Sequence, residues 1–241
     1  MTNKEPIQMT IVYDNNALGE NLKADWGFSC LIRGLEKSIL FDTGTNGKIL
    51  LSNMEKLGIQ PKVVDQVLLS HEHRDHTGGL KALLAKNSNV EAWIPAYFSS
   101  NFKNMVRSAG ASVKEVTDFQ KICTGAFTTG IVKGWIREQS LILETKKGLI
   151  VVTGCAHPRI IKIIATVKEL LKENIHMVFG GFHLAAFNES EISEIIYNFR
   201  ESGVEKVGPC HCTGDDARRL FAEEYKENFI DIGVGKEIKV Q

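Results

Sequence analysis

Four side chains that can bind a metal lie close together in the segment Ser70-His71-Glu72-His73-Arg74-Asp75-His76-Thr77-Gly78-Gly79. They are His71, His73, Asp75 and His76, in a chain that contains only seven histidines. Residues two positions apart in an extended segment point to the same side, so His71 and His73 can bind one ion together. Asp75 and His76 come where the chain turns into a helix, and they can bind a second ion. Such ligands favour Zn²⁺, with Fe²⁺, Mn²⁺ or Mg²⁺ as alternatives.

Three further histidines each follow the end of an expected strand. They lie in the segments Thr153-Gly154-Cys155-Ala156-His157-Pro158, Gly180-Gly181-Phe182-His183-Leu184 and Pro209-Cys210-His211-Cys212-Thr213-Gly214. Strand ends meet at one rim of a sheet, where side chains from separate elements can converge. We expect His157 and His211 to be metal ligands, and His183 to be a ligand or a substrate contact. His176 begins an apolar strand without a glycine-rich turn, and we expect it to be structural.

The His-x-His-x-Asp-His run, followed by Thr-Gly-Gly, resembles the signature of the metallo-β-lactamase superfamily. The segment Phe41-Asp42-Thr43-Gly44 is similar to a strand and turn of that superfamily, in which the Asp is a hydrogen-bond acceptor behind the metal ligands. The resemblance implies that Asp42 holds a ligand in place, and that Asp42 and Asp75 are the catalytic residues. The sequence alone is equally compatible with Asp42 capping the turn before a helix at 47–57.

The sequence departs from the superfamily pattern where many members place an acidic residue that bridges two metals. Here Gly154 is followed by Cys155. Either a Cys155 thiolate takes the bridging place, because a metal lowers the pKa of a thiol, or Cys155 is a small buried residue and His157 does the binding. Cys210 and Cys212 form a lone Cys-x-Cys pair, which is weak evidence for a metal site, so we expect them to pack in the core.

Within the superfamily, these motifs together with Arg137-Glu138-Gln139-Ser140-Leu141 are similar to one branch, the dihydropterin-6-methyl-4-(β-D-ribofuranosyl)aminobenzene 5′-phosphate synthase-like proteins. The similarity runs from about Phe28 to Thr213. It implies methanopterin biosynthesis: a condensation of 7,8-dihydropterin-6-ylmethyl diphosphate with 4-(β-D-ribofuranosyl)aminobenzene 5′-phosphate that releases diphosphate. Two divalent ions equally suit a dinuclear zinc hydrolase of a phosphoester, lactone or thioester. A protein that binds a metal or ligand without turnover is the third alternative.

The residues that contact the substrate are harder to read from the sequence. Arg159, at the start of an expected helix, either binds a phosphate together with the helix amides or is an exposed charge. Phe182 either stacks on a pterin or lies in the core. Arg137 and Glu138 either form a buried pair or face the pocket. We expect the residues 112–129, whose secondary structure is ambiguous, to shape that pocket.

Short apolar runs and amphipathic segments predict the scaffold that positions these residues. We expect strands at 9–13, 28–32, 38–41, 67–69, 90–94, 176–179 and 206–207, a hairpin at 140–144 and 148–153, and helices at 47–57, 99–109, 158–171, 190–202 and 215–226. No linker, repeat or low-complexity segment divides the chain. We therefore predict one α/β domain over 1–241. Its expected fold is a metallo-β-lactamase-like αββα sandwich, with two mixed β-sheets packed face to face and helices on the outside.

Composition narrows the classes of function that remain. The chain has 29 Lys and Arg against 29 Asp and Glu, and this balance argues against nucleic-acid binding. Its apolar runs are too short to cross a membrane, and its first residues show no export signal. Five cysteines are too sparse for a disulfide framework. We expect a cytoplasmic enzyme with a small phosphorylated substrate, such as a pterin diphosphate, and no nucleic-acid or membrane partner; the sequence leaves the oligomeric state open.

Overall fold

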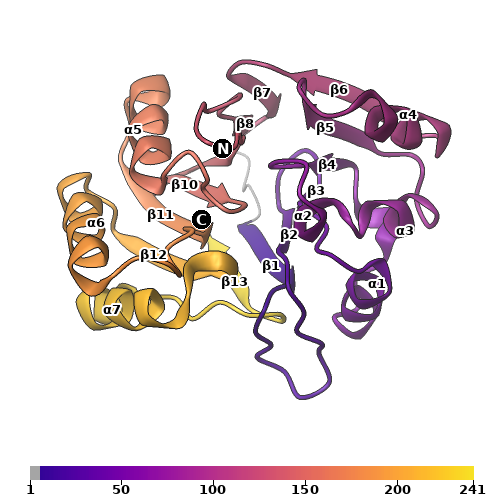
Figure 1. The fold of residues 1–241 in the computed structure, drawn as a ribbon. Coiled ribbons are helices and arrows are strands. Elements are labelled where there is room, and N and C mark those ends of the chain that lie inside the picture. Colours follow the sequence, from indigo (N-terminus) through magenta and orange to yellow (C-terminus); the bar gives the residue numbers. More distant parts are fainter. Residues whose placement is uncertain (1–5) are drawn as a thin grey trace.

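Two β-sheets pack against each other in the computed structural model, which describes residues 6–241 (Figure 1). The first sheet has the strand order β13-β1-β2-β3-β4-β5-β6 and the second has the order β12-β11-β10-β9-β8-β7. Both sheets are mixed, since each contains parallel and antiparallel pairs. The expectation about an export signal concerns mainly residues 1–5, which lie outside the described residues.

Except for β13, the strands of the first sheet come from the N-terminal half of the chain and those of the second from the C-terminal half. The first sheet contains β1 (Ile7–Tyr13), β2 (Ser29–Arg33), β3 (Ile39–Phe41), β4 (Gln66–Leu68), β5 (Glu91–Pro95), β6 (Ser112–Val116) and β13 (Glu237–Val240). The second contains β7 (Gln120–Cys123), β8 (Ala126–Thr128), β9 (Leu141–Thr145), β10 (Gly148–Thr153), β11 (Ile175–Gly181) and β12 (Lys206–Cys210).

Helices cover the outer faces of both sheets (Figure 1). Those on the side of the first sheet are α1 (Gly47–Lys56), α2 (Arg74–Thr77), α3 (Leu80–Leu84) and α4 (Ser100–Ser108). Those on the side of the second are α5 (Ile160–Leu171), α6 (Glu189–Glu201) and α7 (Asp215–Tyr225). This arrangement confirms the αββα sandwich expected from the sequence. None of the helices in residues 6–241 combines the length and the apolar character needed to cross a bilayer.

The apolar run of β10 is buried on both faces, which explains why it lacks alternation with polar residues. Ile150 and Val152 point into the core between the two sheets, whereas Leu149 and Val151 pack in the core beneath the helices of the second sheet. Burying a side chain of this size contributes about 1.5–3 kcal/mol. The strand that leads to Cys155 and His157 is thereby fixed from both sides.

One expected helix boundary is corrected, and the structure defines segments that the sequence left ambiguous or did not reveal. The helix expected from Pro158 begins only at Ile160, because the residues 154–159 form a separate loop. The ambiguous residues 112–129 contain β6, β7 and β8, at the edges of the two sheets. The short α3 and the strand β13 were not expected, since segments of four or five residues show too little periodicity to be recognised.

Candidate metal centre

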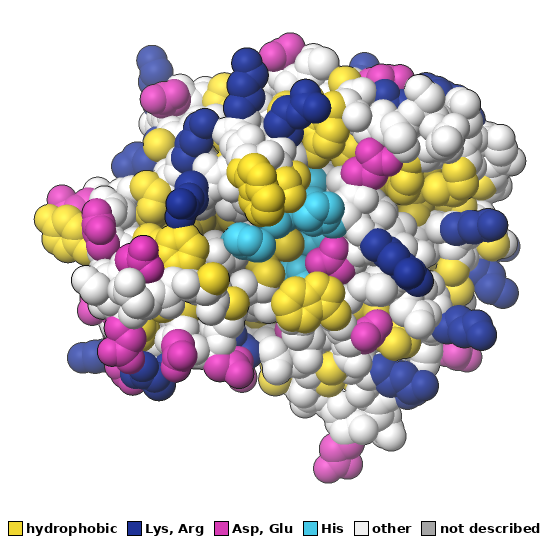
Figure 2. Space-filling model, in the orientation of Figure 1, with side chains coloured by type: hydrophobic (Ala, Val, Ile, Leu, Met, Phe, Trp, Pro, Cys, Tyr) yellow, Lys and Arg dark blue, Asp and Glu magenta, His cyan; other side chains and the backbone are white. Residues whose placement is uncertain are grey.

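The segments that carry the expected ligands all follow the C-terminal ends of strands. β3 and β4 are parallel neighbours, and so are β10, β11 and β12, so these ends lie on one rim of the sandwich. Figure 2 shows histidine side chains gathered in a hollow near the middle of one face, with hydrophobic side chains beside them. His176 instead lies near the opposite end of β11, where its Nδ1 is 2.8 Å from Glu205 Oε2.

The potential ligand atoms form three groups, within each of which the atoms lie no more than 4.8 Å apart. The groups are His71, His73 and His157; Asp75, His76, Cys155 and His211; and Cys155, His183 and Cys212. The first two groups each combine residues that follow β4 with residues that follow β10 or β12. All six expected metal ligands are thus brought together from both sheets.

Three ring nitrogens of the first group, on His71 and His157, are free to bind a metal. Among the described residues, His71 Nε2 and both ring nitrogens of His157 are buried without a hydrogen-bond partner, although an unpaired buried polar group costs about 1–3 kcal/mol. Burial and the neighbouring imidazoles lower the pKa of His71, and they lower the pKa of His157 to about 3. Neutral imidazole is the form that binds metals, so these residues fit a divalent ion.

Asp42 organises the second group from behind. Its Oδ1 accepts a hydrogen bond from the Ser70 amide and its Oδ2 accepts one from Ser70 Oγ, both at 2.7 Å. The same Oδ2 lies 2.7 Å from His76 Nδ1, and this contact leaves His76 Nε2 facing Cys155 Sγ at 3.1 Å. Burial lowers the pKa of His76, but Asp42 and Asp75 outweigh it and raise that pKa to about 9. Asn46, not Asp42, caps α1.

Cys155 is buried and belongs to the group of Asp75, His76 and His211, and not to the three-histidine group. Burial raises the pKa of its thiol, as does the neighbouring Cys212. Cys210 packs in the core between the sheets, as expected. Cys212 is buried as well, but its Sγ lies in a ligand group with Cys155 and His183. The sequence did not single out Cys212 as a site residue.

Glu138 is buried and fixes the loop after β10. Its Oε1 accepts hydrogen bonds from the amides of Gly154, Cys155 and Ala156 at 3.1, 2.9 and 3.0 Å, and its Oε2 accepts one from the amide of His157 at 3.0 Å. Burial raises the pKa of Glu138 to about 7, although these amides lower it. The alternatives considered from the sequence were an ion pair with Arg137 or a place in the pocket, and neither includes this role.

Arg137 and Trp26 lie at the edges of the site. The guanidinium of Arg137 lies over the ring of Tyr97, with its carbon 4.4 Å from the ring centroid. Trp26 Nε1 donates a hydrogen bond to Asp75 Oδ2 at 3.0 Å, and its ring centroid lies 5.0 Å from that of His211. Trp26 was missed because the sequence separates it from Asp75 by 49 positions, and no local pattern links the two.

A cavity of about 680 Å³ opens beside the ligand groups. Its lining includes Trp135, His157, Arg159, Phe182, His183 and Phe187. Phe182 is only 1% exposed and packs against Phe199 and Phe221, so it is mainly a core residue. None of the residues 112–129 lines this cavity, so the expectation that they shape it is wrong.

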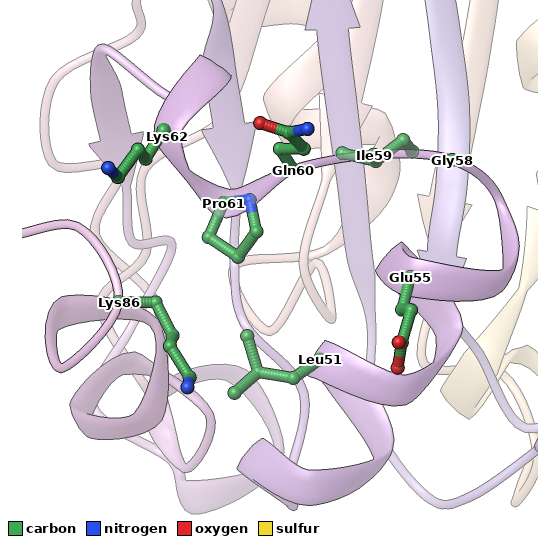
Figure 3. A pocket seen from close by; sticks show the side chains of 8 residues that line it. All are labelled: Leu51, Glu55, Gly58, Ile59, Gln60, Pro61, Lys62 and Lys86. Atoms are coloured by element: carbon green, nitrogen blue, oxygen red, sulfur yellow. The ribbon is translucent and has the colours of Figure 1, made fainter.

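A second cavity, of about 610 Å³, lies between the end of α1 and the segment that follows it (Figure 3). It is lined by Leu51, Glu55, Gly58, Ile59, Gln60, Pro61, Lys62 and Lys86. Among these residues only Glu55 carries a carboxylate, and none is a histidine or a cysteine. This cavity therefore offers no cluster of metal ligands.

Comparisons with known proteins agree with this geometry. The model of the metallo-beta-lactamase superfamily matches residues 27–162. The 7,8-dihydropterin-6-methyl-4-(beta-D-ribofuranosyl)-aminobenzene-5'-phosphate synthase of Methanocaldococcus jannaschii is 32% identical, over 88% of this chain and 89% of its own. The crystal structure of a metal-dependent hydrolase of the beta-lactamase superfamily is 30% identical, with a TM-score of 0.82 over 97% of this chain and 99% of its own. A metallo-beta-lactamase fold protein from Bacillus subtilis is 14% identical, covers 98% and 100% of the two chains, and has a TM-score of 0.73.

Proposed function

The chain belongs to the metallo-beta-lactamase superfamily, and from this premise we propose that it is a two-metal enzyme that releases diphosphate from a pterin diphosphate by condensing it with a phosphorylated aminobenzene. The observation that carries the proposal is the pair of ligand groups at one rim, in a chain 32% identical to a synthase over most of both lengths. Its substrate would be a small phosphorylated molecule.

We assign one ion to His71, His73 and His157 and the other to Asp75, His76, Cys155 and His211. The first set supplies only nitrogen atoms, and the second supplies nitrogen, oxygen and sulfur atoms. Zinc binds all three kinds of atom, and the zinc assignment is part of the proposal. When bound, two such ions polarise phosphoryl oxygens and neutralise the charge of a departing diphosphate. Many relatives have a carboxylate that bridges the two metals at the position of Cys155. In our assignment Cys155 would instead bind only the second ion.

The protein's own residues hold these ligands in place. Asp42 fixes the ring orientation of His76, and Asn15 Oδ1 lies 3.0 Å from His211 Nδ1 and does the same for that ring. Glu138 fixes the loop of Cys155 and His157. His183, whose side chain is exposed at the cavity, is placed to contact a substrate and not to complete either ion's set of ligands.

Metal analysis of the purified protein, combined with an assay of diphosphate release, tests the proposal. The substrate is 7,8-dihydropterin-6-ylmethyl diphosphate, with and without 4-(β-D-ribofuranosyl)aminobenzene 5′-phosphate. We expect two equivalents of metal and release that depends on the second substrate. His71→Ala should lack one equivalent and nearly all release, whereas His176→Ala, the matched control, should keep both.

A hydrolase is the second candidate, because the structural relative at 30% identity is described as a metal-dependent hydrolase. The same assay separates the two. Release of diphosphate without the second substrate would favour the hydrolase, and protein without bound metal would contradict both.

A further inference from the structure

We propose that the cavity beside the ligand groups binds a planar aromatic ring between Trp135 and Phe187, and that Arg159 binds an anionic group carried by the same molecule. The inference rests on the proposed function and deepens it, since it assigns a binding site to the part of the substrate that does not react. Nothing in the comparisons assigns these three residues a role.

The cavity is continuous with the proposed metal centre. His157, which belongs to the three-histidine group, and His183 and Cys212, which belong to the third group, all line it. A molecule whose phosphates lie at the histidines can therefore extend directly into it. The volume of about 680 Å³ is within the range of pockets that enclose small organic ligands, about 300–1,000 Å³.

The walls of the cavity are apolar and aromatic. Leu184, Phe187 and Ile195 come from the turn before α6 and from α6 itself, and Trp135 comes from the segment before β9. Trp135 is 88% exposed, which is unusual for so large an apolar side chain. A flat ring that covers it would remove this apolar surface from water.

Arg159 supplies the positive charge. Its guanidinium carbon lies 5.0 Å from the centroid of the Phe187 ring, at the edge of the same cavity. The residue adopts a φ of 81°, a conformation that a residue with a side chain rarely adopts, directly before α5. Figure 2 shows further Lys and Arg side chains on the part of this face that carries α5, so the surroundings favour an anion.

Binding of 1-naphthyl phosphate, which combines a planar ring with a phosphate, tests the inference by isothermal titration calorimetry on the protein as purified. Ribose 5-phosphate carries the phosphate without an aromatic ring, and 1-naphthol carries the ring without a phosphate. We expect naphthyl phosphate to bind more tightly than either of the other two compounds.

Substitutions then separate the ring from the charge. Trp135→Ala and Phe187→Ala should each weaken binding of naphthyl phosphate about tenfold, the typical effect of removing one stacking partner. Arg159→Gln should weaken naphthyl phosphate about tenfold but leave 1-naphthol unchanged. Matched controls are Tyr197→Ala, an exposed aromatic of α6 outside this cavity, and Arg107→Gln on α4; both should bind as the unaltered protein does.

Unchanged binding in Trp135→Ala and Phe187→Ala, or ribose 5-phosphate binding as tightly as naphthyl phosphate, would overturn the inference. The failure of this inference and the failure of the proposed function can be distinguished. If the variants lose binding but the protein does not release diphosphate from the pterin diphosphate, the pocket assignment stands and the function is wrong. If diphosphate is released with an unchanged KM in all three variants, the function stands and the pocket assignment is wrong.

Discussion

Glu138 shows how one buried carboxylate can position several ligands at once. It satisfies four consecutive amides of the loop that carries Cys155 and His157, and no other described side chain accepts from them. Without it, buried N–H groups would be left unpaired, and the loop would lose the contacts that fix its path.

We therefore expect Glu138→Ala to lower the free energy of unfolding by about 3–5 kcal/mol, as for other buried charged groups whose partners are left unpaired. Glu138→Gln should lower the free energy of unfolding by about half as much, since the amide oxygen of Gln can still accept from the three amides that Oε1 accepts from. Urea unfolding measures both. Glu144→Ala, an exposed residue of β9, is the control and should change stability by less than about 0.5 kcal/mol. A Glu138→Ala variant as stable as this control would contradict the role.

The proposed division of ligands makes a separate prediction about metal content. His73→Ala should lose the ion of the three-histidine group, and Asp75→Ala should lose the other, because each variant removes a ligand from one group only. Elemental analysis of the purified variants measures this. Two equivalents retained in either variant would show that its residue is not a ligand.

The two residues that flank α5 are not glycines, yet both have a positive φ: Arg159 at 81° and Lys172 at 53°. The two positions differ in their surroundings, because Arg159 lines the cavity and Lys172 does not. Lys172 ends the helix in the left-handed conformation, where glycine is the preferred residue. At Arg159, the proposed binding of an anion would account for a residue with a side chain at this strained position.

Lys172→Gly should consequently raise the free energy of unfolding by about 0.5–1 kcal/mol, since it relieves left-handed strain at a helix end. Arg159→Gly should give a similar gain but lose the tight binding of naphthyl phosphate. Lys168→Gly, inside the same helix, should instead cost about 1 kcal/mol. Thermal and urea unfolding measure all three variants, and a destabilised Lys172→Gly would refute the argument.

Elements with a clear apolar run or stripe could be predicted from the sequence, including the short strands β3 and β4, and elements without one could not. The helix over Ile160–Leu171 has a complete apolar stripe, whereas β6 is largely exposed and shows no alternation. The clustering of His71, His73, Asp75 and His76 could be predicted because their spacing is local, and that of His157 and His211 because each follows the end of a strand. The roles of Glu138 and Trp26 depend on contacts with residues far along the chain, which no local pattern encodes.

The proposed metal centre would link the two sheets, because each ion would take ligands from segments that follow strands of both sheets. An ion bound only by the folded protein stabilises it by mass action, by about 2.7 kcal/mol at a hundred times the dissociation constant. Removal of metal with a chelator should therefore lower Tm, and added metal should restore it in a concentration-dependent way. His71→Ala should show a smaller shift than His176→Ala, and an unchanged Tm on chelation would contradict the bridging of the two sheets.

The pairing of β1 with β13 has a consequence for how the chain is made. β13 follows every other strand of the structure, yet it pairs with β1 at the start of the first sheet. During synthesis from the N-terminus, β1 must remain an open edge, and His71 and His73 are present long before His211 emerges from the ribosome. A nascent chain therefore holds four of the seven proposed metal ligands before the other three are made. The contacts that close the sheet are among the last that can form.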